Sequence, residues 1–101
     1  MLTGAPAALY GLVDRGVLRP GAWADVVVFD AHTVGPGEIE MRHDMPAGAP
    51  RLYSTPTGVE HVLVAGTQVV RDGGQLTGEL PGQVLRSGRD TRTVRVADVP
   101  Y

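Results

Sequence analysis

Glycine and proline punctuate this chain at short intervals and so limit the length of any regular element it can form. The 101 residues include 14 glycines and eight prolines, and neither residue type is favoured inside a long helix or a central strand. Valine, with fifteen residues, outnumbers leucine with nine, and isoleucine occurs once. Because valine favours strands while glycine and proline favour turns, the sequence predicts a mainly β chain of short elements.

The composition is that of one small domain with a modest core. Of its residues, 43% are apolar and 20% are charged, with nine basic against eleven acidic side chains and no cysteine to form a disulfide. The basic residues are all arginines and do not cluster, so we expect no nucleic-acid partner. No apolar run approaches the roughly 20 residues of a membrane span, and the N-terminus lacks a basic signal region. We therefore expect a cytoplasmic protein with no membrane contact.

The first third of the chain predicts a helix, a turn and a strand. Residues 5–10 contain helix formers between Thr3, a potential cap, and Gly11, a stop signal. The dipeptide Pro20-Gly21 fits the centre of a type II turn, because proline restricts φ to negative values and glycine accepts positive ones. Residues 26–29, three valines and a phenylalanine, predict a buried strand.

The second half predicts a β-hairpin over residues 59–76. Two β-rich runs flank Ala65-Gly66, which suits a type II turn, or a type I′ turn if Ala65 adopts a positive φ. Asp72-Gly73 predicts a further turn, followed by a short strand at Gln75 and Leu76.

The remaining segments carry weaker signals. Residues 31–58 are interrupted by glycine and proline throughout and predict a long loop, with one edge strand at 38–42. Residues 86–101 are polar and predict a surface-bound or mobile tail, with a last strand at 93–96.

Two segments of the chain resemble two successive sequence patterns of the amidohydrolase superfamily. Residues 16–30 match its pattern G-x-(I/L)-x-x-G-x-x-A-D-(L/V)-V-(V/L)-(F/L)-D. Residues 62–73 match V-x-V-N-G-x-x-V-V-x-(D/N)-G, with Ala65 where the family usually has asparagine. Three more stretches, 6–12, 14–16 and 77–86, make the chain similar to the D-aminoacylase branch, the N-acyl-D-amino-acid deacylases.

The resemblance implies an architecture. In that family these segments lie at the carboxyl end of a longer enzyme, whose (β/α)₈ barrel holds the metal, while strands from both ends of the polypeptide build a small β-sandwich. Residues 1–13 would be a remnant of the last barrel helix. Residues 14–85 would form the C-terminal half of this composite domain of metal-dependent hydrolases, with the long loop 31–58, and residues 86–101 the tail.

The resemblance also implies that this chain does no chemistry alone. The zinc ligands and catalytic aspartate of the family belong to barrel strands that nothing in this sequence resembles, so we expect no catalytic, cofactor-binding or metal-binding residue here. The complete family members hydrolyse amide C–N bonds with a metal-activated water. The sequence thus predicts a non-catalytic C-terminal domain or fragment of such an amidohydrolase.

Candidate reactive residues fit this expectation. The three histidines, His32, His43 and His61, match no zinc-binding spacing, although the adjacent Asp44 could orient His43. Ser54 and Ser87 lack a nucleophile elbow and a paired base.

Three further residues are interpreted as structural. Asp25 is expected to accept backbone N–H bonds at the entry of the strand. Trp23 is expected to fill the join between helix and sheet. His61 is expected at the surface near the start of its strand, on the opposite face from Glu60.

A half-sandwich would leave one apolar face uncovered. We therefore expect self-association, as a homodimer or higher oligomer, through that face or through free strand edges. The strands concerned contain Val26, Val28, Val62, Val64 and Val69. The competing interpretation is a stand-alone β-domain that binds a protein or a small ligand through loop 31–58.

Overall fold

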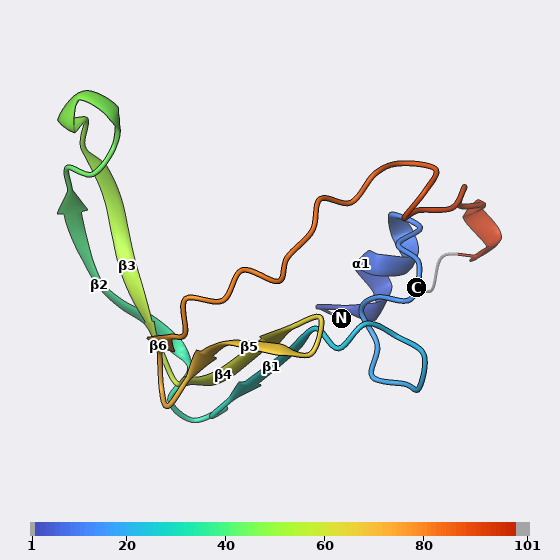
Figure 1. The fold of residues 1–101 in the computed structure, drawn as a ribbon, viewed down its shortest axis with the longest axis horizontal. Helices are drawn as coiled ribbons and strands as arrows, with labels where there is room; N and C mark the ends of the chain where they lie inside the picture. The colour runs from blue at the N-terminus through green and yellow to red at the C-terminus, as the bar shows by residue number, and fades with distance from the viewer. Residues whose placement is uncertain (1, 99–101) are drawn as a thin grey trace.

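A computed structural model describes residues 2–98 and has a mainly β fold. Its elements are α1 (Gly4–Leu9), β1 (Val26–Phe29), β2 (Gly35–Arg42), the 3₁₀ helix η1 (Pro46–Gly48), β3 (Arg51–Thr57), β4 (Val59–Val64), β5 (Thr67–Arg71), β6 (Gln75–Leu76) and the 3₁₀ helix η2 (Val96–Asp98). The strands form a four-stranded sheet, ordered β1-β4-β5-β6, and a two-stranded sheet, β2-β3 (Figure 1). The predicted fold class, mainly β with one short helix, is confirmed.

The β4–β5 hairpin is the centre of the larger sheet. Its strands pair antiparallel with Val64 opposite Thr67, as the sequence predicts. Both turn residues have a positive φ, 49° for Ala65 and 79° for Gly66, which identifies the type I′ alternative. This turn is favoured in hairpins because its twist matches the twist of the flanking strands.

Two other predicted turns are present. Ala22 N–H donates to the carbonyl of Arg19 at 3.1 Å and Gly21 has a φ of 88°, which is the predicted type II turn. Asp72 and Gly73 turn the chain from β5 into β6 with φ values of 49° and 78°. Local turn chemistry therefore acts here as expected.

The helix α1 ends in a Schellman motif. Gly11 N–H donates to the Ala8 carbonyl at 3.1 Å and Leu12 N–H donates to the Ala7 carbonyl at 2.9 Å, while Gly11 has a φ of 66°. A Cβ at Gly11 would also collide with the Arg92 carbonyl oxygen. Thr3 occupies the N-cap position, as expected, but its side chain makes no capping hydrogen bond.

The prediction of a long loop over residues 31–58 is wrong, because most of this segment is a β-hairpin. We call β2, η1 and β3 the arm; it projects away from the larger sheet (Figure 1). Prolines at the base of the arm made its sequence resemble a loop: Pro36 pairs with Pro56 there, beside a register irregularity. The outer half, 39–42 paired with 51–54, contains no proline and keeps a regular ladder. The predicted edge strand at 38–42 is part of β2.

The C-terminal segment returns to the helix as an extended strand-like trace (Figure 1). It pairs with the chain after α1 through Leu12 and Thr91, and Arg92 N–H donates to the Gly11 carbonyl at 2.8 Å. The predicted strand at 93–96 does not form, since this pairing ends near Arg92 and η2 begins at Val96. The last residues of the predicted tail, 99–101, lie outside the described residues.

The described chain has almost no core. Ala7 is the one buried apolar residue among residues 2–98. The radius of gyration is 16.7 Å, against about 13 Å for a compact domain of 100 residues. The expectation of a buried strand at 26–29 is wrong, because Val27, Val28 and Phe29 are 55%, 46% and 54% exposed. Their strand β1 lies at the sheet edge, and no second layer of described residues covers its faces.

Candidate functional site

Asp25 joins three segments that are distant in sequence. Its Oδ1 accepts the Ala65 N–H at 2.9 Å, and its Oδ2 accepts the Arg15 guanidinium at 2.6 Å. The predicted backbone hydrogen bond to this carboxylate is therefore present, and it fixes the type I′ turn at the entry of β1. Both oxygens are engaged in holding the fold.

Trp23 lies beside this carboxylate and differs from its prediction. The Arg15 guanidinium stacks over the indole ring at 4.7 Å from its centre. The ring remains 43% exposed, so it does not fill a closed join between α1 and the sheet. The region between those elements is open, and Arg15 covers only part of the indole.

Among the described residues, His61 is the one histidine whose ring has a hydrogen-bond partner. His61 Nδ1 is 2.8 Å from the Gln68 side-chain amide, across the β4–β5 pair, and is half-buried. The Asp44 carboxylate does not orient His43, because both of its oxygens bind Arg51. No group of three potential metal ligands occurs among the described residues.

A charged cluster at the end of the arm escaped the sequence analysis. Asp44 accepts two hydrogen bonds from Arg51, at 2.6 and 2.7 Å, and the hydrogen bond lowers the pKa of the Asp44 carboxyl. Arg42 binds Glu40 at 2.6 Å and stacks on Tyr53 at 3.5 Å from the ring centre. The sequence signal was an Asp and an Arg placed seven residues apart around the Pro46 turn, a pairing that becomes evident only once the hairpin is known.

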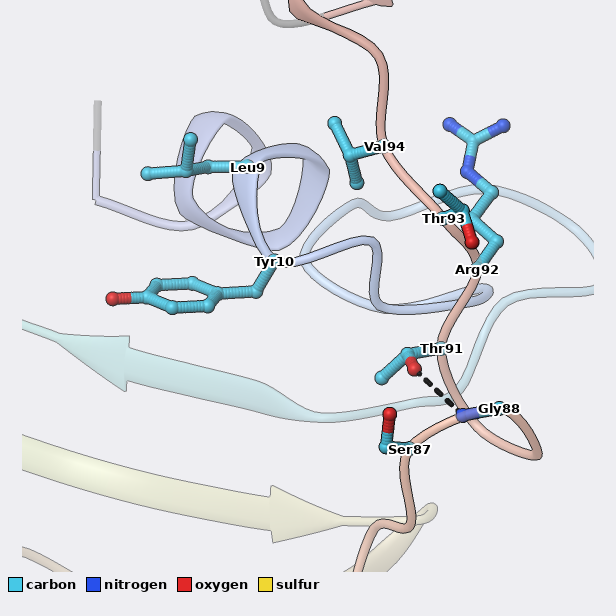
Figure 2. A pocket seen from close by; sticks show the side chains of 8 residues that line it. All are labelled: Leu9, Tyr10, Ser87, Gly88, Thr91, Arg92, Thr93 and Val94. Atoms are coloured by element: carbon cyan, nitrogen blue, oxygen red, sulfur yellow. Dashed lines mark hydrogen bonds between the residues drawn. The ribbon is translucent and has the colours of Figure 1, made fainter.

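A hollow of about 390 Å³ lies between the end of α1 and the C-terminal segment. Figure 2 shows Leu9 and Tyr10 on one side, and on the other Ser87, Gly88, Thr91, Arg92, Thr93 and Val94. The Thr91 hydroxyl accepts the Gly88 N–H at 3.0 Å, and no histidine or carboxylate lines the hollow. Ser87 therefore has no general base within it that could activate its hydroxyl.

Apolar side chains gather in two further hollows on the larger sheet. One lies over β1 and is lined by Val27 and Phe29 together with Val17 and Leu18. The other is lined by one residue each of β4, β5 and β6 (Val64, Val69 and Leu76) and by residues 78–82 after β6, of which Leu80 is 93% exposed. Both hollows are lined mainly by apolar side chains rather than by a cluster of reactive groups.

The total surface measures how much of the chain is uncovered. The described chain exposes 7924 Å², whereas a compact protein of this mass exposes about 5,500 Å². No described helix has the length and apolar character needed to cross a membrane. Fold and surface together define a small β chain whose sheets present apolar faces outward.

Comparison with known proteins places this chain in a family. Residues 1–70 match the sequence profile described as "Amidohydrolase family", and the chain belongs to this family. It is 45% identical over 85 residues to an N-acyl-D-glutamate deacylase and 41% identical over 87 residues to an N-acyl-D-aspartate deacylase, both from Alcaligenes xylosoxydans xylosoxydans.

The matched regions differ greatly in their share of each protein. They cover 84% and 86% of this chain but 15% and 16% of the two relatives, so the chain spans about one-sixth of their length. No solved structure matches it significantly. The resemblance to the amidohydrolase superfamily, expected from residues 16–30 and 62–73, is confirmed. The resemblance to its D-aminoacylase branch, expected from residues 6–12, 14–16 and 77–86, is confirmed as well.

Proposed function

We propose that this chain is the non-catalytic C-terminal portion of an amidohydrolase that resembles the N-acyl-D-amino-acid deacylases. One observation carries the proposal: the edge strand β1 of the larger sheet is apolar and yet exposed, as at Val27 and Phe29, and the central strands β4 and β5 are only half-buried. Such faces are stable when another layer covers them. In the whole enzyme that layer would come from the rest of the polypeptide.

The chemistry of the whole enzyme would lie outside this chain. We infer metal-dependent hydrolysis of an amide C–N bond, with an N-acyl-D-amino acid as substrate, because both relatives are named as deacylases of that kind. The donor set of this chain does not fit a zinc ion, since no three potential metal ligands come together among the described residues. We therefore derive no catalytic step within it.

The role of this chain would be to support the barrel. The hydrogen bond of Asp25 to the Ala65 N–H and the type I′ turn give β1, β4 and β5 a defined arrangement. The remaining layer could pack onto this arrangement. The competing role, ligand binding by an independent domain through residues 31–58, has less support. That segment is a hairpin, and none of the hollows described above is lined by it.

A chimeric enzyme tests this proposal. In it, this chain replaces the matched 85-residue segment of the N-acyl-D-glutamate deacylase, and hydrolysis of N-acyl-D-glutamate is measured. We expect the chimera to retain activity, and the relative without the segment to lose it. In the chimera, Val27→Asp places a charge on the exposed β1 strand and should reduce the yield of folded enzyme. Its matched control is Val34→Asp, outside the strands.

Two outcomes would contradict the proposal. A relative that stays folded and fully active without the segment would show that the segment supports nothing. Hydrolysis of N-acetyl-D-amino acids by the purified 101-residue chain, together with stoichiometric zinc, would show that the chain is itself an enzyme.

A further inference from the structure

The outer half of the arm has two chemically different faces. Directly paired residues of an antiparallel sheet point to the same face, and successive residues alternate. Met41 pairs with Leu52 and Ile39 pairs with Ser54, so the three apolar side chains share one face. We call Ile39, Met41 and Leu52 the apolar face of the arm. They are 74%, 55% and 69% exposed.

The opposite face is occupied by interactions within the arm. Glu40 pairs with Tyr53 and Arg42 pairs with Arg51 in the register, and the Arg42 and Arg51 guanidinium groups stack at 3.5 and 4.9 Å from the centre of the Tyr53 ring. Asp44 holds Arg51 from the turn. The charges of this face are therefore matched locally, which leaves the apolar face as the one without a partner.

A two-stranded hairpin is marginally stable in water unless one face packs on something. The arm projects from the larger sheet (Figure 1), and Ile39 and Leu52 are among the more exposed apolar residues of the described chain. The apolar face therefore requires a covering surface.

The area of this face distinguishes a tethered partner from a separate one. Three side chains exposed to this extent offer roughly 400 Å², so two arms packed together would bury roughly 800 Å² in total, against about 1,200 Å² or more for a stable dimer. An area of this size is sufficient only where the partner is already held nearby, because a covalent link removes most of the entropy cost of association.

We propose that the arm docks through Ile39, Met41 and Leu52 onto an uncharged, apolar surface of the catalytic portion of the same polypeptide, and not onto a second copy. This inference rests on the function proposed above. It adds a contact separate from the one proposed for the larger sheet. The arm, which projects away from that sheet, makes this contact.

Amide hydrogen exchange in the chimera tests the docking. We expect amides of residues 39–42 and 51–54 to exchange at least about tenfold more slowly in the chimera than in the isolated chain. The triple variant Ile39→Thr, Met41→Thr, Leu52→Thr should lose that protection and lower the Tm of the chimera. The conservative variant Ile39→Val, Met41→Leu, Leu52→Ile should retain both.

A matched control removes three apolar groups elsewhere that are at least as exposed as those of the arm. The triple variant Leu80→Thr, Val84→Thr, Val96→Thr should leave the protection of the arm unchanged, since these residues lie outside it. An active chimera whose arm stays unprotected, or whose Tm the arm variant does not change, would overturn the docking and leave the proposed function standing. An inactive, unfolded chimera would instead count against the proposed function.

The mass of the isolated chain supplies the last distinction. Light scattering of the arm variant and of the unmodified chain at equal concentration should give the same mass. If the arm variant alone becomes smaller, the apolar face binds a second copy, and the tethered partner is wrong.

Discussion

At the residue scale, a few polar side chains connect segments that would otherwise be separate. Asp25 bonds both to the β4–β5 turn and to Arg15, whose side chain is only 14% exposed. It thereby holds Ala65 in a left-handed conformation with a φ of 49° that alanine disfavours. Sequence reasoning identified Asp25 as structural but did not identify its partners, because Arg15 and Ala65 are ten and forty residues away.

Removal of this carboxylate should therefore be costly. Asp25→Ala leaves the Arg15 charge without its partner and the Ala65 N–H without its acceptor, and we expect a loss of about 1–3 kcal/mol in the free energy of unfolding. Urea denaturation at a fixed protein concentration measures it. The control Arg19→Ala breaks the exposed pair that Arg19 forms with Asp14 and should change stability by about 0–1 kcal/mol. Equal effects of the two variants would show that Asp25 has no special structural role.

At the element scale, ordered hairpins arise from two kinds of signal. The β4–β5 hairpin has a favoured dipeptide at its turn and β-rich strands on either side, so its sequence predicts it. The arm has no such signal. Its turn is η1, and it is held by cross-strand contacts such as Asp44 with Arg51 and Arg42 with Tyr53. These contacts depend on a register that composition does not reveal.

The arm should respond to acid. Arg51 lowers the pKa of Asp44 in the folded chain, so this pair contributes stability above the unfolded pKa of about 3.9, and the contribution disappears as the pH falls through the lower, folded value. We expect the arm to loosen below about pH 4. The amide and side-chain NMR signals of residues 42–53 would monitor this transition. Asp44→Asn should remove this pH dependence, whereas Asp14→Asn should preserve it. A transition that persists unchanged in Asp44→Asn would contradict the assignment.

At the scale of the whole molecule, the exposed surface is the dominant property. It exceeds that of a compact protein of this mass by about 2,400 Å², well above the roughly 800 Å² that each partner buries in a standard interface. Sheets with both edges free, as β1 and β6 are here, are prone to associate. We infer that the isolated chain covers part of this surface by self-association.

Light scattering on the purified chain tests the oligomer. We expect a mass at or above twice the 10.6 kDa of one chain, little reduced by salt, because apolar contacts are not screened. Val27→Lys should shift the equilibrium toward the monomer, since it places a charge on an exposed residue of β1. The control Val34→Lys, outside the strands, should leave the mass unchanged. A monodisperse monomer at high concentration would contradict the prediction.

The sequence by itself determined the family and the local geometry: the turns at Pro20-Gly21 and Asp72-Gly73, the end of α1 at Gly11, and the β4–β5 hairpin. Each depends on the backbone preferences of neighbouring residues, which act within a few positions of the chain. Only the tertiary structure decided that residues 31–58 form an arm, that Asp44 binds Arg51, and that the apolar β1 is exposed. Strand pairing and burial are set by contacts between distant segments. Periodicity alone therefore assigns β1 to a core, whereas Val27, Val28 and Phe29 are exposed among the described residues.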